Sequence, residues 1–191
     1  MRLFVALEIP SEVRNLLAAW IKNLSAVQPS SAQKNVRWVR PENLHVTLKF
    51  IGEIPVDKLD SIRGELNAVG SDHLVELRFR GVGFFPSERR PRVLWVGMEA
   101  PANLASLAGE IEQRLEKLGI ERERRPFTPH LTLARFDPPG ISEGLRNKVQ
   151  ENLAYDFGLL RTSEFHLIQS KLKPTGAEYT ALQSFRFAAE A

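Results

Sequence analysis

The sequence contains no cysteine among its 191 residues. Disulfides, thiolate nucleophiles and cysteine-based metal sites are therefore excluded, and the zero count fits a reducing compartment. Long hydrophobic runs are also missing, since no stretch approaches the roughly 20 apolar residues that a membrane-spanning helix needs. Glu8 and Pro10 follow the first apolar residues too closely for a signal peptide. We therefore expect a cytoplasmic protein without a membrane segment.

The chain also lacks a large excess of one charge, because 26 Lys and Arg residues against 23 Asp and Glu residues give a net charge of +3. A value this small argues little for nucleic-acid binding by itself. Arginines do gather in the segments 89–92 and 122–125. Each segment fits a solvated loop as well as a surface that faces phosphate.

A repeated tetrapeptide is the most informative feature of the chain: the sequence HVTL at 45–48 recurs as HLTL at 130–133. Apolar and polar residues alternate through both copies and their flanks, which is typical of a half-buried β-strand. Residues two apart share one face of a strand, so each copy places its imidazole and its hydroxyl side by side. Two such strands facing each other would offer two imidazoles flanked by two hydroxyl donors, which suits acid–base chemistry on a phosphate.

His45 and His130 are therefore the candidate catalytic residues. The ordinary histidine pKa of about 6.5 allows one imidazole to take a proton from water while the other, protonated, donates to a leaving oxygen. Thr47 and Thr132 could hydrogen-bond the phosphoryl oxygens as charge develops on them. One His-x-Thr on a strand would mean little, because such residues are common on sheet faces, whereas two copies in matching contexts are hard to attribute to chance.

Other residues fit this site less directly. Arg135 offers a permanent charge with bidentate geometry for phosphate, but five residues after His130 it falls on the opposite strand face unless the strand bends or bulges. A metal site is a competing interpretation of paired histidines, weakened because neither motif supplies a carboxylate or a third histidine at ligand spacing. We expect His73 in a surface loop and His166 in a structural position within a strand.

Hydrophobic periodicity predicts helices that alternate with groups of strands, several of them joined as hairpins. This pattern favours an α+β fold with largely antiparallel sheets. The two motif regions look like equivalent halves of a pseudo-duplicated chain, although the repeat itself is local. The predicted helices cover 11–24, 55–69, 104–118 and 142–153, and the predicted strands cover 1–7, 36–39, 44–50, 74–79, 93–98, 129–136, 164–173 and 178–187.

The sequence resembles the 2H phosphoesterases, and within them the bacterial and archaeal RNA 2′,3′-cyclic phosphodiesterases first described as 2′-5′ RNA ligases. The resemblance runs nearly end to end, and no motif position departs from the family pattern. It is carried by RLFVAL at 2–7, RWV at 37–39, ENLHVTLKFIGE at 42–53, GFFP at 83–86, PRVLWVG at 91–97 and FTPHLTLAR at 127–135.

The resemblance implies one domain over residues 1–191, a bilobal fold in which two antiparallel sheets backed by helices enclose a central cleft. It also implies hydrolysis of a terminal RNA 2′,3′-cyclic phosphate to a 2′-phosphate, without a metal or another cofactor. Carried over by position, His45 is the proton donor to the leaving 3′ oxygen and His130 the proton acceptor that activates water. Thr47, Thr132 and Arg135 would bind the phosphoryl oxygens. The near symmetry of the two motifs leaves the two histidine roles exchangeable on sequence grounds.

Phe50 and Phe4 fall in family-like positions near the cleft, where an aromatic face could stack on a nucleobase, although each could equally be a core residue of its strand. We expect a monomer that acts on RNA ends or nucleotides bearing a 2′,3′-cyclic phosphate. Three alternatives stay open. These are 2′-5′ RNA ligation by the reverse reaction, hydrolysis of another small cyclic phosphate or of 2′-5′ linked oligoadenylate, and a non-catalytic RNA- or nucleotide-binding module.

Overall fold

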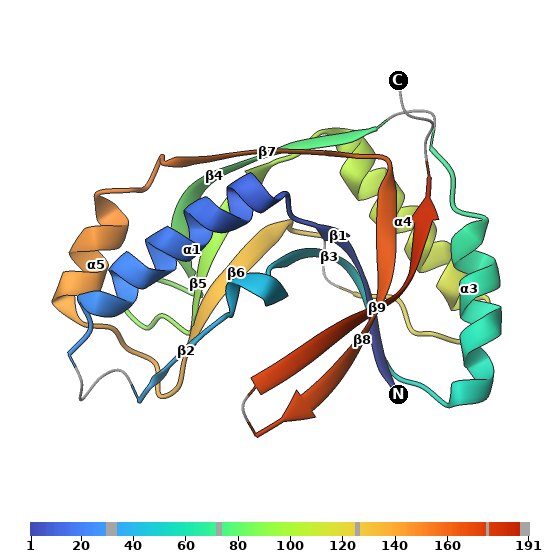
Figure 1. The fold of residues 1–191 in the computed structure, drawn as a ribbon, viewed down its shortest axis with the longest axis horizontal. Coiled ribbons are helices and arrows are strands. Elements are labelled where there is room, and N and C mark those ends of the chain that lie inside the picture. The colour runs from blue at the N-terminus through green and yellow to red at the C-terminus, as the bar shows by residue number, and fades with distance from the viewer. Residues whose placement is uncertain (30–33, 72–73, 125–126, 175, 188–191) are drawn as a thin grey trace.

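The computed structural model describes residues 1–29, 34–71, 74–124, 127–174 and 176–187, which form two antiparallel sheets (Figure 1). The first sheet has the strand order β3-β1-β8-β9 and the second has β2-β6-β5-β4-β7. The predicted α+β class is therefore confirmed. In chain order the elements are β1 (Arg2–Glu8), α1 (Ser11–Ala26), β2 (Val36–Trp38), η1 (Pro41–Asn43), β3 (His45–Glu53), η2 (Val56–Lys58), α3 (Leu59–Asn67), β4 (Val75–Phe85), β5 (Val93–Glu99), α4 (Ala102–Glu116), β6 (His130–Phe136), α5 (Glu143–Gln150), β7 (Asp156–Thr162), β8 (Glu164–Lys173) and β9 (Gly176–Arg186).

The two sheets are built on the same plan. β1 pairs with β3 in the first sheet as β5 pairs with β6 in the second, and a helix, α1 or α4, lies between the two strands of each pair in the sequence. β4, from the first half of the chain, pairs with β5, whereas β8, from the second half, pairs with β1. The chain is therefore pseudo-duplicated with two strands exchanged in each direction: β2 and β4 join the second sheet, and β8 and β9 join the first. One HxT motif lies in each sheet.

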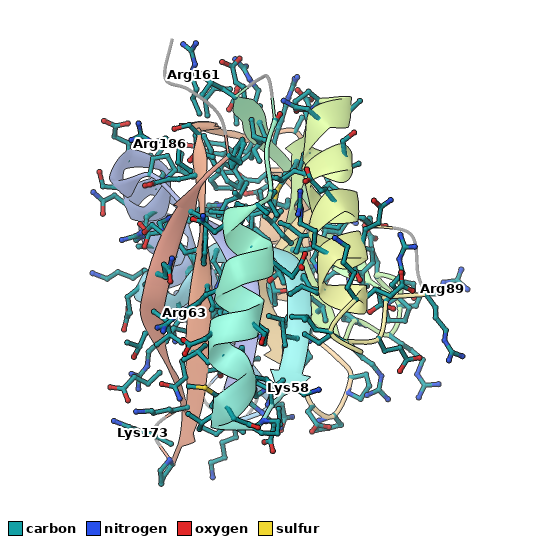
Figure 2. All side chains as sticks on the ribbon, turned by 90° about the vertical axis from the view of Figure 1, so that its right-hand side faces the viewer. Lys58, Arg63, Arg89, Arg161, Lys173 and Arg186 are labelled. Carbon is teal, nitrogen blue, oxygen red and sulfur yellow. The ribbon has the colours of Figure 1, made fainter. Side chains whose placement is uncertain are left out.

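Helices cover the outer face of each sheet. α3 and α4 lie side by side, with α4 against β3 and α3 against β9 (Figure 2). α1 packs on β7 of the second sheet and also contacts α5. Among the described residues, no helix is both long and apolar enough to cross a membrane.

The two faces of β1 show how the core and the cleft are separated. Leu3, Val5 and Leu7 are fully buried in the main hydrophobic core, because alternate residues of a strand point to one face. Phe4 and Ala6 point to the other face, where they form a separate small apolar cluster with Ile168 and Tyr179. This second cluster lies beside the motif side chains of β3 on the cleft face of the sheet, since Phe4 is paired with Phe50 and Ala6 with Thr47.

Most predicted elements are present close to their predicted bounds, but two strands differ. β7 is absent from the predicted strands because Asp156 and Gly158 disfavour strand structure and only Phe157 and Leu160 of it are buried. β4 continues beyond its predicted end to Phe85.

The extension of β4 passes through two glycines, which weaken the strand signal in the sequence. One of them, Gly83, has a packing reason: a Cβ at this position would lie 2.5 Å from the Trp95 ring on the paired strand. The predicted helix over 55–69 is also shorter than expected, because residues 56–58 form a separate 3₁₀ turn before α3.

A β-bulge follows each motif threonine. In the first sheet Ala6 pairs with Thr47 and Val5 with Lys49, so Leu48 is the additional residue. In the second sheet Trp95 pairs with Thr132 and Leu94 with Ala134, so Leu133 is the additional residue there. A bulge shifts the alternation by one position. The residue three after each threonine is therefore brought to the same face as the histidine and threonine before it.

Candidate active site

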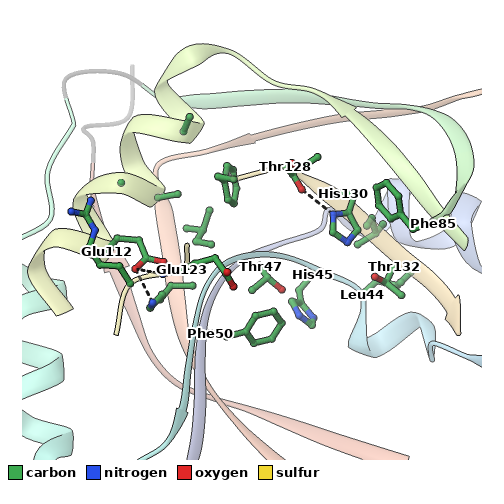
Figure 3. Close-up of a pocket in the computed structure, with 18 of the residues that line it drawn as sticks. Leu44, His45, Thr47, Phe50, Phe85, Glu112, Glu123, Thr128, His130 and Thr132 are labelled. Atoms are coloured by element: carbon green, nitrogen blue, oxygen red, sulfur yellow. Dashed lines mark hydrogen bonds and ion pairs between the residues drawn. The ribbon is translucent and has the colours of Figure 1, made fainter. Parts of the chain in front are cut away.

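A cleft of about 1470 Å³ is lined by residues of both sheets, of α4 and of the segment that leads into β6. His45 and Thr47 extend into it from β3, and His130 and Thr132 from β6 (Figure 3). The structure thus brings together the four motif side chains that the sequence places 85 residues apart in two strands. The alternation of each strand does the local positioning, because the intervening residues Val46 and Leu131 are buried on the opposite face.

Both histidines are oriented by the same kind of contact. Nδ1 of His45 lies 2.7 Å from the carbonyl oxygen of Asn43, and Nδ1 of His130 lies 2.9 Å from that of Thr128. A carbonyl oxygen can only accept a hydrogen bond, so Nδ1 carries the proton and donates it in each ring. The proton on a neutral ring is therefore fixed on Nδ1, and Nε2 is left available for proton transfer.

Aromatic rings enclose His45. Its ring centroid lies 4.6 Å from that of Phe4 and 5.2 Å from that of Tyr179, which meets it edge-on. Burial among these groups lowers the pKa of His45 below its ordinary value, because a charged imidazole is poorly solvated there, and the Asn43 carbonyl opposes this shift. The neutral form of His45 is thus favoured in the free protein.

His130 has a different neighbourhood. Phe85 meets its ring edge-on at 5.3 Å and is itself stacked on Trp95 at 5.1 Å. Phe85 is 37% exposed and lies at the end of the part of β4 that the sequence did not predict. Two histidines in nearly identical motifs are therefore embedded in unequal surroundings.

The bulges decide where Phe50 and Arg135 point. Arg135 pairs with Val93, two residues before Trp95, the partner of Thr132. Residues two apart share a face, so Arg135 lies on the cleft face despite its odd spacing from His130. The bulge that the spacing required is present. Phe50 holds the equivalent position in the first sheet and is 65% exposed.

Phe4, the other candidate for base stacking, is only 3% exposed. Its ring is covered by His45 at 4.6 Å, Tyr179 at 5.0 Å and Phe50 at 6.1 Å. Phe4 therefore has almost no face left for a nucleobase and instead supports the imidazole of His45.

A buried ion pair fixes one wall of the cleft. The ammonium of Lys49 lies 2.7 Å from a carboxylate oxygen of Glu112 on α4 and donates to the carbonyl oxygen of Glu121 at 2.6 Å. The same carboxylate accepts from the backbone N–H of Glu123 at 3.4 Å. The side chains of Lys49 and Glu112 are 3% and 14% exposed. The strand of the first motif is thereby tied to the segment that leads to the second.

The remaining sequence candidates are distributed as follows. Of the arginines at 122–125, Arg122 and Arg124 line the cleft, and Arg125 lies outside the described residues; the segment 89–92 does not line it. His166 is buried and Nδ1 of its ring lies 2.9 Å from the Ser184 hydroxyl, in keeping with the predicted structural position. His73 lies outside the described residues. In the described part of the chain, no group of three or more His, Asp or Glu side chains has a metal-binding arrangement.

Three cleft residues carry contacts that the sequence analysis did not predict: Tyr179, Phe85 and Lys49. The partner of Lys49 could have been anticipated from the sequence, because a charged residue between Leu48 and Phe50 in a mostly apolar strand needs an opposite charge when it is buried. No sign of Phe85 or Tyr179 is present in the sequence, because each meets its histidine from a strand that is distant in the chain and is not paired with the motif strand.

Comparison with known proteins gives a consistent result. The family model of the LigT like phosphoesterases matches the chain twice, over residues 7–95 and 96–179. An RNA 2′,3′-cyclic phosphodiesterase of Archaeoglobus fulgidus is 36% identical over 187 residues, which cover 97% of this chain and 99% of that protein. A crystal structure of a Thermus thermophilus protein is similar with a TM-score of 0.77 and 32% identity, and the match covers 98% of both chains. A crystal structure of E. coli LigT complexed with NADP+ gives 0.76 and 26%, again over 98% of both. Since both halves match the family model and a relative above 30% identity covers nearly the whole chain, the protein belongs to the LigT like phosphoesterase family.

Proposed function

We propose that this enzyme hydrolyses a terminal RNA 2′,3′-cyclic phosphate to a 2′-phosphate by acid–base catalysis with two histidines. The observation that carries the proposal is the pair of imidazoles in one cleft, each with Nδ1 bound to a carbonyl and Nε2 available. The identity to a protein named RNA 2′,3′-cyclic phosphodiesterase supports the same substrate class.

In the proposed reaction, Nε2 of His130 accepts a proton from a water molecule as its oxygen attacks phosphorus. The bond between phosphorus and the 3′ oxygen breaks, and Nε2 of protonated His45 donates a proton to that oxygen. The products are a 2′-phosphomonoester and a free 3′-hydroxyl. His130 then holds a proton and His45 has lost one, so exchange with solvent restores both. Each proton transfer contributes about 10²–10⁴-fold to the rate.

Charge develops on the non-bridging oxygens during this step. The hydroxyls of Thr47 and Thr132 lie in the cleft beside the two histidines and are placed to donate to these oxygens. Arg135 adds a permanent positive charge from the same face of β6. The exposed ring of Phe50 offers a stacking surface for the terminal base, a contact worth about 1–3 kcal/mol per base.

Burial of His45 bears on its role as the acid. The lowered pKa makes protonated His45 a strong proton donor, but it also makes that form scarce in the free protein. A bound cyclic phosphate carries a negative charge, which favours the imidazolium form of a neighbouring histidine. We therefore expect His45 to gain its proton when substrate binds.

The test uses a short RNA that ends in a 2′,3′-cyclic phosphate, incubated with purified protein in EDTA, with the product identified by phosphorus NMR. The wild-type protein should yield a 2′-phosphate, and His45→Ala and His130→Ala should each lower kcat by about 10²–10⁴-fold. Thermal unfolding of each variant establishes that the fold is retained.

Four results would contradict the proposal. A 3′-phosphate product would mean that the 2′ oxygen leaves. Full activity of either histidine variant would remove that residue from the mechanism. Loss of activity in EDTA, restored by a divalent metal, would replace two-histidine catalysis with a metal-dependent mechanism. Binding of a 2′-phosphorylated RNA with no turnover of the cyclic form would instead favour a binding module.

A further inference from the structure

Two arginines of the cleft differ from its other basic side chains. Within the described part of the chain, Arg2 and Arg135 make neither an ion pair nor a hydrogen bond, and Glu53, which stands opposite Arg2 in the sheet, does not reach it. The other cleft-lining cations are each paired with a carboxylate: Lys49 with Glu112 at 2.7 Å, Arg122 with Glu116 at 3.6 Å and Arg124 with Glu121 at 2.8 Å. The free positive charge of the cleft is therefore concentrated at Arg2 and Arg135.

Tyr179 lies near enough to both guanidinium groups for their charge to act on it. The positive charges of Arg2, from the first sheet, and Arg135, from the second, both act on its phenol and lower its pKa, although burial has the larger effect and raises it overall. The hydroxyl therefore stays protonated at neutral pH and can donate. Its ring is held edge-on against Phe4 and His45, and its hydroxyl has no hydrogen-bond partner within the described residues.

Arg2 lies beyond the reacting centre, and Tyr179 spans the distance between the two, because its ring meets His45 edge-on. Three residues of β1 point to the cleft face. Ala6 is paired with the motif residue Thr47, Phe4 is paired with Phe50 to form a row of two aromatic rings, and Arg2 lies on the far side of that row from Thr47. Arg2 pairs with Ser170, which in turn pairs with Tyr179, so Arg2 and Tyr179 share one row across the sheet. An aromatic row therefore separates this row from the motif threonine.

We propose that Arg2, with the hydroxyl of Tyr179, forms a subsite for the phosphodiester on the 5′ side of the terminal nucleotide, so that the preferred substrate is an RNA chain. The inference rests on the proposed function, because it assumes a reacting phosphate between the two motifs. That phosphate already has two hydroxyls, two imidazoles and Arg135 as partners. With the terminal base on Phe50, the next anion of the chain lies beyond the aromatic row, where the unpaired guanidinium of Arg2 and the Tyr179 hydroxyl share one row of the sheet.

A free 5′-phosphate on a mononucleotide offers similar chemistry, so three substrates with the same terminal base are needed. They are a nucleoside 2′,3′-cyclic phosphate with a 5′-hydroxyl, the same compound with a 5′-phosphate, and a tetranucleotide with a 2′,3′-cyclic end. Arg2→Ala should lower kcat/KM for the tetranucleotide about tenfold more than for the 5′-hydroxyl compound, since a hydrogen bond to a charged group is lost only there. Tyr179→Phe should lower the same ratio in the same direction.

The matched control is Arg161→Ala. Arg161 is an exposed arginine on β7, the edge strand that β4 and β5 separate from β6. Figure 2 places it at the opposite end of the molecule from Lys173 of the β8–β9 hairpin. This variant loses the same charge and should leave the ratio of the two kcat/KM values unchanged. Arg2→Lys, which keeps the charge, should retain most of the preference for the tetranucleotide.

The salt dependence of RNA binding distinguishes a lost phosphate contact from a purely structural effect of the substitution. Each phosphate contact with a single strand contributes roughly −0.7 to the slope of log affinity against log salt concentration. The slope for the tetranucleotide should become shallower by about this amount in Arg2→Ala and stay unchanged in Arg161→Ala.

The inference is overturned if Arg2→Ala lowers kcat/KM equally for all three substrates, or for none. It is also overturned if only the 5′-phosphorylated mononucleotide is affected, since the subsite then takes a phosphomonoester. If the wild-type protein turns over none of the substrates, the proposed function fails. The subsite is then tested by binding of a tetranucleotide with a 2′-phosphate end against a nucleoside 2′-phosphate. Arg2→Ala should weaken the former selectively, and equal effects would overturn the subsite as well.

Discussion

The two cleft histidines have the same sequence context and the same Nδ1 contact, but they differ in what surrounds the rest of the ring. His45 is packed between Phe4 and Tyr179, whereas His130 meets the partly exposed Phe85. An active site can obtain an acid and a base from the same residue type when the surroundings of the two side chains shift their pKa values apart. The repeated motif makes both histidines recognisable in the sequence, but the rings that distinguish them are distant along the chain.

The two roles can be separated with a substrate in which sulfur replaces the bridging 3′ oxygen. A thiolate is a much weaker base than an alkoxide, so it leaves without help from an acid. His45→Ala should therefore recover most of its lost rate on this substrate, whereas His130→Ala should not, because its water still needs a base. Single-turnover rates on the oxygen and sulfur substrates provide the measurement. Recovery in His130→Ala alone would exchange the two roles.

Burial of His45 also predicts a pH dependence of stability. Because its pKa in the folded protein lies below the ordinary value of 6.5, the unfolded chain binds a proton at pH values where the folded protein does not. The free energy of unfolding should therefore fall as the pH decreases from 6.5 towards the lowered pKa. His45→Gln removes this contribution. Urea unfolding of both proteins between about pH 5 and 7.5 should show a weaker pH dependence for the variant, and parallel curves would refute the assignment.

At the scale of elements, the bulges in β3 and β6 and the ion pair from β3 to α4 decide which side chains reach the cleft. Lys49 follows the bulge in β3 and points to the face of the sheet covered by α4, where it forms an ion pair with Glu112. Breaking such a buried pair by removing one partner leaves an uncompensated charge, whereas replacing both partners by apolar residues is often neutral.

Glu112→Leu should therefore destabilise the protein by about 3–5 kcal/mol, and Glu112→Leu combined with Lys49→Met by much less. Urea unfolding of Glu112→Leu, of Lys49→Met and of the double variant gives the coupling between the two residues. If the changes in unfolding free energy of the two single variants add up to that of the double variant, the interaction between Lys49 and Glu112 does not contribute to stability. The double variant should also lose order in the segment 121–124, because the contacts of Lys49 with the Glu121 carbonyl and of Glu112 with the Glu123 N–H are lost.

The sequence predicts the motif strands well because one face of each is apolar and the alternation is strong. The face of Arg135 could not be derived from alternation, because a bulge depends on how the neighbouring strand pairs and leaves no mark in the strand's own pattern. β7 was missed for a related reason: its pairing with β4 outweighs the low strand propensity of Asp156 and Gly158. Family resemblance placed Arg135 in the cleft where periodicity did not.

At the scale of the whole molecule, the two halves of the chain cannot form their sheets separately. β1 has β3 from its own half on one side and β8 from the other half on the opposite side, and β5 is likewise placed between β6 and β4. Each half alone would leave the inner edge of its central strand unpaired. One cleft lined by one motif from each sheet follows from this arrangement.

A chain divided between β4 and β5 should test this interdependence. Fragments 1–87 and 88–191 keep Glu88 with its partners Arg146 and Gln150. Neither fragment should show a cooperative thermal transition by circular dichroism, and mixing them during refolding should restore both the transition and the hydrolytic activity. The intact chain serves as the control. A cooperative transition in either isolated fragment would show that a half is stable without the exchanged strands.

The exchanged strands also determine when the protein can fold during its synthesis. β1 (Arg2–Glu8) leaves the ribosome well before its partner β8, which begins only at Glu164. At about 5–20 residues per second, the edge of β1 stays without that partner for roughly 10–30 s. An apolar strand with an open edge is prone to pair with other chains. The arrangement that brings both motifs into one cleft therefore makes the nascent chain dependent on protection, by a chaperone or by low concentration, until β8 emerges.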